Sequence, residues 1–331
     1  MNAMNDMFAI EISEPGGPEV LKAVRRPVPA PGPGEIRIRV EAAGLNGADL
    51  AQRRGVYPPP EGASDLPGLE VAGIVDLCGD GVTDFQPGDR VCALLTGGGY
   101  AQYCCVPEGQ VLPLPPEITM AQGAGLIEAI ATVWTNVFET AALQRGETLL
   151  VHGGTSGIGT TAIQMAKLHH CKVIVTVGSE EKAKAALSLG ADRAIIYRHE
   201  DFASVLKAEK TRIDVILDIV GGPYLDGNLK SLAYGGRLVV IAFSGGRMAQ
   251  LDIARVMMNR LQITGSTLRS RPVAEKARII SEVRTKAWPW VQDGRFKPVI
   301  DSTFPFAEAT AAHRRMEGSG HIGKIILEGF S

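Results

Sequence analysis

The segment VHGGTSGIG, residues 151–159, leaves a short apolar run and enters a helix-like stretch, IGTTAIQMAKLHH. A second apolar run, KVIVTVG, begins at residue 172. Glycines between a strand and a helix let the chain turn tightly and let backbone N–H groups approach a pyrophosphate, which the positive helix end also favours. The glycine spacing departs from G-x-G-x-x-G, but the strand–turn–helix context is complete. We therefore predict a dinucleotide-binding turn; the alternative is a glycine-rich connection that binds nothing.

Apolar runs recur on both sides of this turn and alternate with helix-like segments. They occupy residues 148–153, 172–178, 193–197, 214–221, 237–243 and 261–265. Short strands joined by helical crossovers are typical of a doubly wound parallel sheet. We predict an α/β chain with a six-stranded Rossmann domain at residues 125–266.

The sequence before residue 125 has a different character. It is rich in Gly, Pro and short alternations such as EIRIRVEAAG (35–44), in which Ile36, Ile38 and Val40 alternate with polar residues. This is the pattern of half-buried strands joined by long loops. The C-terminal segments FKPVIDSTFPF and GKIILEGF are strand-like again. We expect the chain to return to its first domain, which then comprises residues 1–124 and 267–331 and is mostly β.

Composition excludes several classes of protein. The 331 residues carry a formal net charge of −2, which argues against a broadly basic nucleic-acid or anionic-membrane binder. The five cysteines form no C-x-x-C pair, so a zinc ribbon or thioredoxin-type motif is not expected. Unpaired cysteines fit a reducing compartment, and we find no signal peptide or convincing membrane span. A cytoplasmic location is expected.

The end of the second predicted strand indicates which dinucleotide is bound. NAD-binding proteins usually carry Asp or Glu there to hold the ribose 2′-OH. Here Gly178 and Ser179 occupy the position, and Lys182 follows. A hydroxyl and an ammonium suit a 2′-phosphate, so we predict NADP rather than NAD. The alternative is that Lys182 is only a solvated helix lysine.

At this point the chain resembles the zinc-free quinone oxidoreductase branch of the medium-chain dehydrogenase/reductase superfamily, and within it the tumour-suppressor-inducible type. The resemblance runs over essentially the whole chain. It is carried by GLNGADLAQRRGVYPPP (44–60), LPGLEVAGIV (66–75), LLTGGGYAQYCCVPEG (94–109), VHGGTSGIG (151–159), VGSEEK (177–182), YRHEDF (197–202), ILDIVGGPY (216–224) and IGKIIL (322–327). It implies a GroES-like catalytic domain built from both chain ends, an NADPH-binding Rossmann domain between them, and a homodimer joined through residues 261–265, an edge strand.

The same resemblance bears on metal binding. Zinc-dependent relatives use a Cys where this chain has Asn46 and a His where it has Leu69, whereas Glu70 is retained. We therefore expect no zinc. Without a Lewis acid, hydride transfer suits an acceptor that delocalises the arriving charge, such as a quinone. Glu70 is expected to be a buried acid paired with an arginine, and His152 a core histidine with satisfied hydrogen bonds.

The resemblance also assigns candidate site residues. Asn46, Tyr57 and Thr132 are candidate catalytic residues at the nicotinamide end; the alternatives are a turn-forming Asn, a rim tyrosine and a packing threonine. The candidate cofactor-binding residues are Gly154, Thr155, Ser156, Gly157, Ile158, Gly178, Ser179, Lys182, Tyr197, Val220, Phe243, Ser244, Leu268 and Arg269.

Three functions remain open on these grounds. The first is an NADPH-dependent quinone oxidoreductase that works by positioning the reactants rather than through one proton-transfer residue. The second is an NADPH-dependent reductase of α,β-unsaturated carbonyls. The third is an NADPH-binding structural protein, crystallin-like, without turnover.

Overall fold

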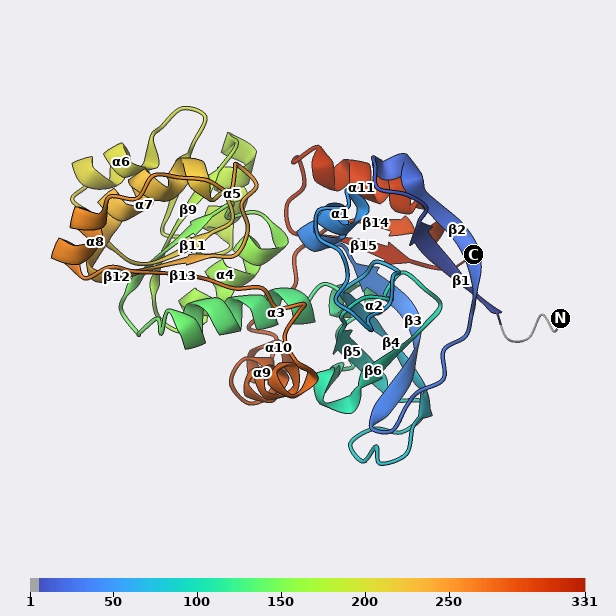
Figure 1. Ribbon diagram of the computed structural model, residues 1–331. Coiled ribbons are helices and arrows are strands. Elements are labelled where there is room, and N and C mark those ends of the chain that lie inside the picture. The colour runs from blue at the N-terminus through green and yellow to red at the C-terminus, as the bar shows by residue number, and fades with distance from the viewer. Residues whose placement is uncertain (1–5, 331) are drawn as a thin grey trace. The chain divides into compact units, whose positions relative to one another are not determined.

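The computed structural model describes residues 6–330, and its chain forms two compact units (Figure 1). One unit contains the residues up to 131 together with those from 268 onward, and the other contains residues 132–267. The predicted boundaries were 124/125 and 266/267.

The central unit is built on a six-stranded parallel sheet in the order β10-β9-β8-β11-β12-β13 (Figure 1). Its strands are β8 (Thr148–His152), β9 (Lys172–Val177), β10 (Arg193–Ile196), β11 (Ile213–Asp218), β12 (Leu232–Val240) and β13 (Gln262–Gly265). Its helices are α4 (Gly157–Leu168), α5 (Glu180–Ser188), α6 (Phe202–Ala208), α7 (Leu225–Ser231) and α8 (Ile253–Asn259), with a short 3-10 turn η4 (Gly222–Tyr224). The predicted six-stranded Rossmann sheet is confirmed.

One face of this sheet is covered by α6 and α7. Phe202 and Leu206 of α6 and Leu229 of α7 pack on Leu150, Ile174, Ile195, Ile216 and Leu238 of the strands, all buried. Alternate residues of each strand therefore point to this face. The π-helix η3 (Trp134–Thr140) contacts β11 and β12.

Two strands end three residues earlier than predicted. The apolar runs at 214–221 and 237–243 predict strands over their whole length, but β11 ends at Asp218 and β12 at Val240. The reason is local at β11, because the Asp218 carboxylate accepts hydrogen bonds from the backbone N–H groups of Val220 (2.6 Å) and Gly221 (3.1 Å) and so turns the chain.

The other unit contains a seven-stranded sheet, β14-β15-β3-β4-β5-β7 with β6 paired to β3, and a separate β1–β2 hairpin. The strands are β1 (Asp6–Ile12), β2 (Leu21–Pro27), β3 (Glu35–Gly44), β4 (Glu70–Cys78), β5 (Arg90–Leu94), β6 (Tyr103–Pro107), β7 (Val111–Pro113), β14 (Ile300–Pro305) and β15 (Lys324–Glu328). Because β15 pairs with β3, the C-terminal segment does return to this sheet, as predicted.

Short helices complete this unit. They are α1 (Gly47–Arg53), α2 (Met120–Gly123), α9 (Val273–Lys286), α10 (Trp288–Gln292) and α11 (Ala309–Glu317), with 3-10 turns η1 (Pro18–Val20), η2 (Glu108–Gln110) and η5 (Phe306–Glu308); α3 (Ile127–Val133) runs to the boundary between the units. Ile36, Ile38 and Val40 of β3 are buried in the core, which confirms the predicted alternation. Among residues 6–330, no helix has the length and apolar character needed to cross a membrane.

Candidate functional site

The glycine turn after β8 is shaped by close packing. Gly153 has φ +73°, a conformation that favours glycine, and a Cβ at Gly154 would lie 2.4 Å from the Val175 Cβ of the neighbouring strand. A Cβ at Gly159 would lie 2.3 Å from the carbonyl oxygen of Gly153. These glycines let the first turn of α4 sit directly against the end of β8. That is the geometry in which a backbone turn can approach a pyrophosphate.

The same turn opens a well-capped helix. The Ser156 Oγ accepts a hydrogen bond from the backbone N–H of Gly159 at 3.0 Å, and Thr155 is buried. The remaining first-turn N–H groups, those of Gly157 and Ile158, belong to the positive end of a 12-residue helix. The predicted residues 154–158 thus form one continuous turn at a helix N-terminus, a geometry that suits an anion.

A second group of predicted residues gathers at the neighbouring ends of β9 and β10. Gly178 follows β9, and Ser179 caps α5 by accepting a hydrogen bond from the Lys182 backbone N–H at 3.3 Å. Tyr197 follows β10 and is 47% exposed. A Cβ at Gly178 would lie 2.8 Å from the Tyr197 hydroxyl, so the tyrosine side chain closely approaches the backbone at Gly178. The residues that carry a hydroxyl (Ser179), an ammonium (Lys182) and a phenol (Tyr197) therefore all follow the neighbouring ends of β9 and β10.

The loops after β11 and β12 lie on the same carboxyl edge of the sheet. The Ser244 Oγ donates to the Ile219 carbonyl at 2.9 Å, and Phe243 is 63% exposed. Val220 is fixed by the buried Asp218, which also accepts from the Asn228 Nδ2 at 2.9 Å. Asp218 stands in the motif ILDIVGGPY but was not among the predicted site residues. Its place at the end of an apolar strand was the available signal.

These loops surround the point where the strand order reverses. The chain runs from β8 to β9 and β10 on one side, and β11 to β13 lie on the other side. Ligands of doubly wound sheets bind outside the carboxyl ends of the strands at this reversal. The predicted residues of the central unit therefore fit a dinucleotide along this edge.

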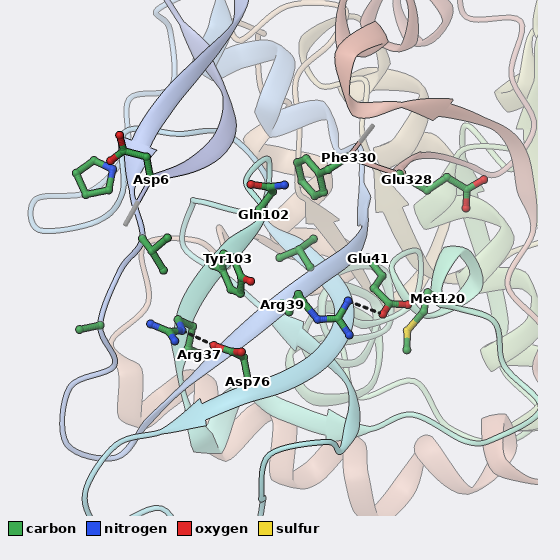
Figure 2. Close-up of a pocket in the computed structure, with 15 residues that line it drawn as sticks. Asp6, Arg37, Arg39, Glu41, Asp76, Gln102, Tyr103, Met120, Glu328 and Phe330 are labelled. Carbon is green, nitrogen blue, oxygen red and sulfur yellow. Dashed lines mark hydrogen bonds and ion pairs between the residues drawn. The ribbon is translucent and has the colours of Figure 1, made fainter. Parts of the chain in front are cut away.

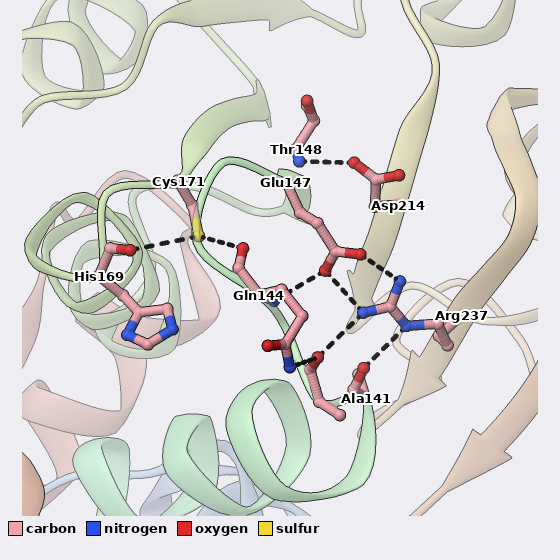
Figure 3. Close-up of polar contacts among 9 residues, drawn as sticks. Ala141, Gln144, Glu147, Thr148, His169, Cys171, Asp214 and Arg237 are labelled. Carbon is pink, nitrogen blue, oxygen red and sulfur yellow. Dashed lines mark hydrogen bonds and ion pairs between the residues drawn. The ribbon is translucent and has the colours of Figure 1, made fainter.

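Thr132 precedes η3, and Arg237 holds the far end of that π-helix (Figure 3). The Arg237 guanidinium donates to the carbonyls of Ala141 (2.8 Å) and Ala142 (3.1 Å) and forms a two-pronged ion pair with Glu147, at 2.7 and 2.9 Å. Two parallel N–H···O bonds make such a pair geometrically specific. The segment that carries Thr132 is thus anchored to β12.

In the other unit, Asn46 lies in a buried polar cluster. Its Nδ2 donates to the Glu70 Oε1 at 3.0 Å, and its Oδ1 accepts from the Lys324 Nζ at 2.8 Å. Lys324 also forms an ion pair with Glu70 at 2.6 Å and donates to the Leu45 carbonyl at 2.7 Å. The expected partner of Glu70 was an arginine, and that prediction is wrong, because β15 places a lysine there instead. Lys324 was missed as a functional candidate, although it stands in the quoted IGKIIL motif.

This cluster tests whether the residues fit a zinc ion. The Lys324 ammonium lies among three oxygen atoms, from Glu70, Asn46 and Leu45. Leu69, which by the resemblance takes the place of a zinc-ligating histidine, is buried and apolar. Zinc sites use Cys, His and carboxylate ligands, and the one carboxylate here is already neutralised by an ammonium. The side chains of this cluster do not fit a zinc site.

Tyr57 is held by Arg269. The Arg269 guanidinium lies over the Tyr57 ring, 5.6 Å from its centroid, and also donates to the Thr96 carbonyl and the Gln52 Oε1, both at 2.8 Å. Burial lowers the pKa of Arg269. Leu268 beside it is buried. These contacts of Arg269, with Tyr57, Thr96 and Gln52, are within its own unit, and its predicted cofactor contact stays a prediction.

Two acids near this cluster have raised pKa values. Burial raises the pKa of Asp49 to about 6, although its carboxylate accepts from the backbone N–H groups of Asn46 and Gly68 at 2.8 and 2.9 Å. Burial, and then the charge of Glu70, raise the pKa of Glu128 to about 8. The backbone N–H of Glu128 donates to the Glu70 Oε2 at 3.0 Å. At neutral pH Glu128 therefore retains a proton to a substantial extent.

His152 is a core residue, as predicted. It is fully buried, with Nδ1 3.0 Å from the Thr176 Oγ1 and Nε2 2.7 Å from the Asn228 Oδ1. Burial lowers its pKa. It therefore stays neutral inside the sheet and is not a candidate base.

A groove of about 1100 Å³ lies beside β3 and β6 (Figure 2). Four of its charged residues form two ion pairs, Arg37 with Asp76 at 2.6 Å and Arg39 with Glu41 at 3.2 Å. The residues that line it include none of the predicted catalytic or cofactor-binding residues. Size alone therefore does not identify the functional site.

Comparison with known proteins gives consistent matches. Residues 32–116 match the alcohol dehydrogenase GroES-like domain, and residues 157–285 match the zinc-binding dehydrogenase family. The quinone oxidoreductase of Rattus norvegicus is 34% identical over 326 residues, covering 97% of each chain. The structure of an Escherichia coli quinone oxidoreductase in complex with NADPH aligns with a TM-score of 0.88 and 30% identity, covering 97% of this chain and 100% of that one. An NAD-dependent alcohol dehydrogenase aligns with a TM-score of 0.86 and 32% identity, covering 98% and 100%.

Proposed function

This chain belongs to the medium-chain dehydrogenase/reductase superfamily and is an oxidoreductase, and from that premise we propose that it is an NADPH-dependent quinone oxidoreductase that needs no metal. The observation that carries the acceptor class is the Lys324 ammonium on the Glu70 carboxylate, 2.6 Å away. By the resemblance to zinc-dependent relatives, Glu70 belongs to a motif that would supply zinc ligands. A separate observation, the set of candidate residues at the carboxyl ends of the central sheet's strands, supports NADPH as the cofactor.

NADPH fits the residues along that edge. When bound, it supplies a hydride from its nicotinamide ring. The turn at residues 154–158 offers backbone N–H groups to the pyrophosphate. Ser179 and Lys182 suit the 2′-phosphate, and Tyr197 stands beside them. Phe243, Ser244 and Val220 lie on the loops nearer the strand-order reversal and are proposed to face the nicotinamide half.

In this proposal the acceptor itself must stabilise the negative charge that the hydride brings. An isolated ketone needs a Lewis acid or a proton donor for the developing alkoxide. A quinone spreads the charge over its ring and second oxygen. With Glu70 bound to an ammonium and an amide, the cluster offers no open metal coordination, so a delocalising acceptor is the chemistry that these side chains permit.

Asn46, Tyr57 and Thr132 are proposed to position the reactants. Asn46 is rigid because both ends of its amide are hydrogen-bonded. Tyr57 is held against Arg269, and Thr132 sits at the end of α3. Well-oriented reactants alone can account for about 7–11 kcal/mol of a barrier. Catalysis then depends on placement, and Tyr57→Phe should reduce turnover only modestly.

An assay of NADPH oxidation over a panel of acceptors tests this proposal. Ortho- and para-quinones should be reduced with higher kcat/KM than enals and enones. Preference for enones would replace the proposal with the second function, a reductase of α,β-unsaturated carbonyls. Binding of NADPH without oxidation by any acceptor would favour the structural, crystallin-like function.

A cytoplasmic homodimer is part of the proposal. β13 is an edge strand, and apolar side chains near it are exposed: Ile253 (72%), Met257 (71%), Met258 (66%) and Ile263 (40%). Such an edge favours pairing with a second copy about a two-fold axis. Light scattering should give a dimer that Ile263→Pro, which removes a backbone donor, weakens. A monomeric wild-type protein at working concentration would exclude this arrangement.

A further inference from the structure

The π-helix η3 contains a buried asparagine with two partners. Within η3 the backbone carbonyl of Asn136 accepts from Ala141, five residues on, at 3.0 Å. The side chain of Asn136 is 2% exposed, and its Nδ2 donates to the backbone carbonyl of Thr132 at 2.8 Å. In an α-helix that carbonyl would accept the backbone N–H of residue 136. Isolated π-helical segments are uncommon and often mark functional positions.

The orientation of the Asn136 amide is determined by its surroundings. A backbone carbonyl only accepts hydrogen bonds, so the amide nitrogen must face Thr132 and the Oδ1 must face away. The Ser266 Oγ lies 2.7 Å from that Oδ1 and donates to it. Ser266 directly follows β13, whereas Thr132 begins the unit. One buried side chain therefore ties the segment where the chain enters the central unit to the segment where it leaves, since that unit ends at residue 267.

We propose that Asn136, oriented by Ser266, is a positioning residue that fixes Thr132 for hydride transfer. The inference rests on the proposed role of Thr132 at the nicotinamide. A displacement of about 1 Å at a positioning contact can lower a rate by about 10²-fold. The adenosine half of the cofactor is held by other residues, at the ends of β9 and β10. Loosening Asn136 should therefore lower turnover far more than cofactor affinity.

The chain offers matched variants. Asn136→Asp keeps the size of the side chain but cannot donate to the Thr132 carbonyl. Ser266→Ala removes the hydroxyl that orients the amide, and Ser266→Thr retains it. Ser231→Ala is the control, because the Ser231 Oγ is also buried in this unit and donates to a helix carbonyl, that of Gly227 at 2.8 Å.

The kinetic readouts are kcat at saturating quinone, the isotope effect with NADPH deuterated at the transferred position, and the NADPH dissociation constant. Asn136→Asp should lower kcat at least about tenfold and raise the isotope effect, with the dissociation constant changed less than about twofold. Ser266→Ala should show a smaller loss in the same direction. Ser266→Thr should restore wild-type kcat, and Ser231→Ala should leave it unchanged.

A readout without cofactor completes the test. Amide hydrogen exchange should quicken in residues 127–141 of Asn136→Asp and stay as in the wild type over α6 and α7. Wild-type kcat and isotope effect in both Asn136→Asp and Ser266→Ala, in an active wild-type enzyme, would overturn the inference. Unchanged exchange in residues 127–141 would also overturn it. If the wild type fails to oxidise NADPH with any of the acceptors tested, the proposed function fails. The hydrogen-exchange result then still decides whether Asn136 fixes residues 127–141.

Discussion

Replacing Lys324 by Met should be among the most destabilising single changes in the unit that contains residues up to 131 and from 268 onward. Methionine keeps much of the aliphatic stem and removes the ammonium. That ammonium lies 2.6 Å from the Glu70 carboxylate, 2.7 Å from the Leu45 carbonyl and 2.8 Å from the Asn46 Oδ1. The side chains of Lys324 and Glu70 are 5% and 0% exposed. Breaking a buried pair on one side leaves an uncompensated charge and costs about 3–5 kcal/mol.

Urea unfolding followed by tryptophan fluorescence measures this loss. The chain has three tryptophans, and Trp134 lies in the central unit whereas Trp288 and Trp290 lie in the same unit as Lys324. In a Trp134→Phe background the fluorescence therefore reports the unit that contains Lys324, which matters because two units need not unfold in one step. Lys286→Met is the control, because its ion pair with Glu282 is exposed on α9 and is expected to contribute only about 0.3–0.5 kcal/mol.

Adding Glu70→Gln to Lys324→Met should recover part of the loss, since the buried charge is then removed as well. The coupling between the two positions should be at least about 1 kcal/mol. A loss below about 1 kcal/mol for Lys324→Met, comparable with the Lys286→Met control, would refute the argument that Lys324 neutralises Glu70.

Three further predictions concern the cofactor and the cluster. Lys182→Ala should raise the KM for NADPH about 10- to 100-fold, because one charge-assisted phosphate contact contributes about 1.5–3 kcal/mol, and should leave the KM for NADH within about twofold. Lys184→Ala, at an exposed neighbouring lysine, is the control. Equal effects on both cofactors would contradict the assignment of Lys182 to the 2′-phosphate. Gly154→Ala should destabilise the protein by about 1–3 kcal/mol in thermal unfolding, because the new Cβ would lie 2.4 Å from the Val175 Cβ. Gly47→Ala is the control, because a Cβ there would meet nothing within 4 Å. Equal melting temperatures for the two variants would exclude the clash at Gly154. The pKa of Glu128 is raised from 4.5 to about 8 by burial and by Glu70, so its stabilising contribution is full below pH 4.5 and is lost as pH rises through 8. Glu128→Gln should therefore gain stability relative to the wild type between pH 6 and pH 9, and a pH-independent difference would show that Glu128 does not titrate there.

The fold was largely predictable because its signals are local. The apolar runs at 148–153 and 172–178 became β8 and β9, and the glycine turn between them became the start of α4. Strand ends were predicted less well. Apolar residues continue past Asp218, but its side chain turns the chain through hydrogen bonds to Val220 and Gly221, a contact that an apolar pattern does not reveal.

The grouping of candidate residues was predictable where neighbours in sequence are also neighbours in space. Ser179 and Lys182 lie in one helix turn, and residues 154–158 form one loop. The cluster around Glu70 joins β4, the start of α1 and β15, which are far apart in the chain. Nothing near Glu70 in the sequence indicates Lys324, because pairing of β15 with β3 is a long-range event. The same holds for Asn136 and Ser266, which are 130 residues apart.

The central claim, metal-independent reduction of quinones by NADPH, is tested most directly by one assay on protein dialysed against a chelator. Turnover of NADPH with a quinone and the metal content are measured on the same sample. The account predicts full turnover with zinc well below one ion per chain. Turnover that is lost on dialysis and restored by added zinc would contradict it.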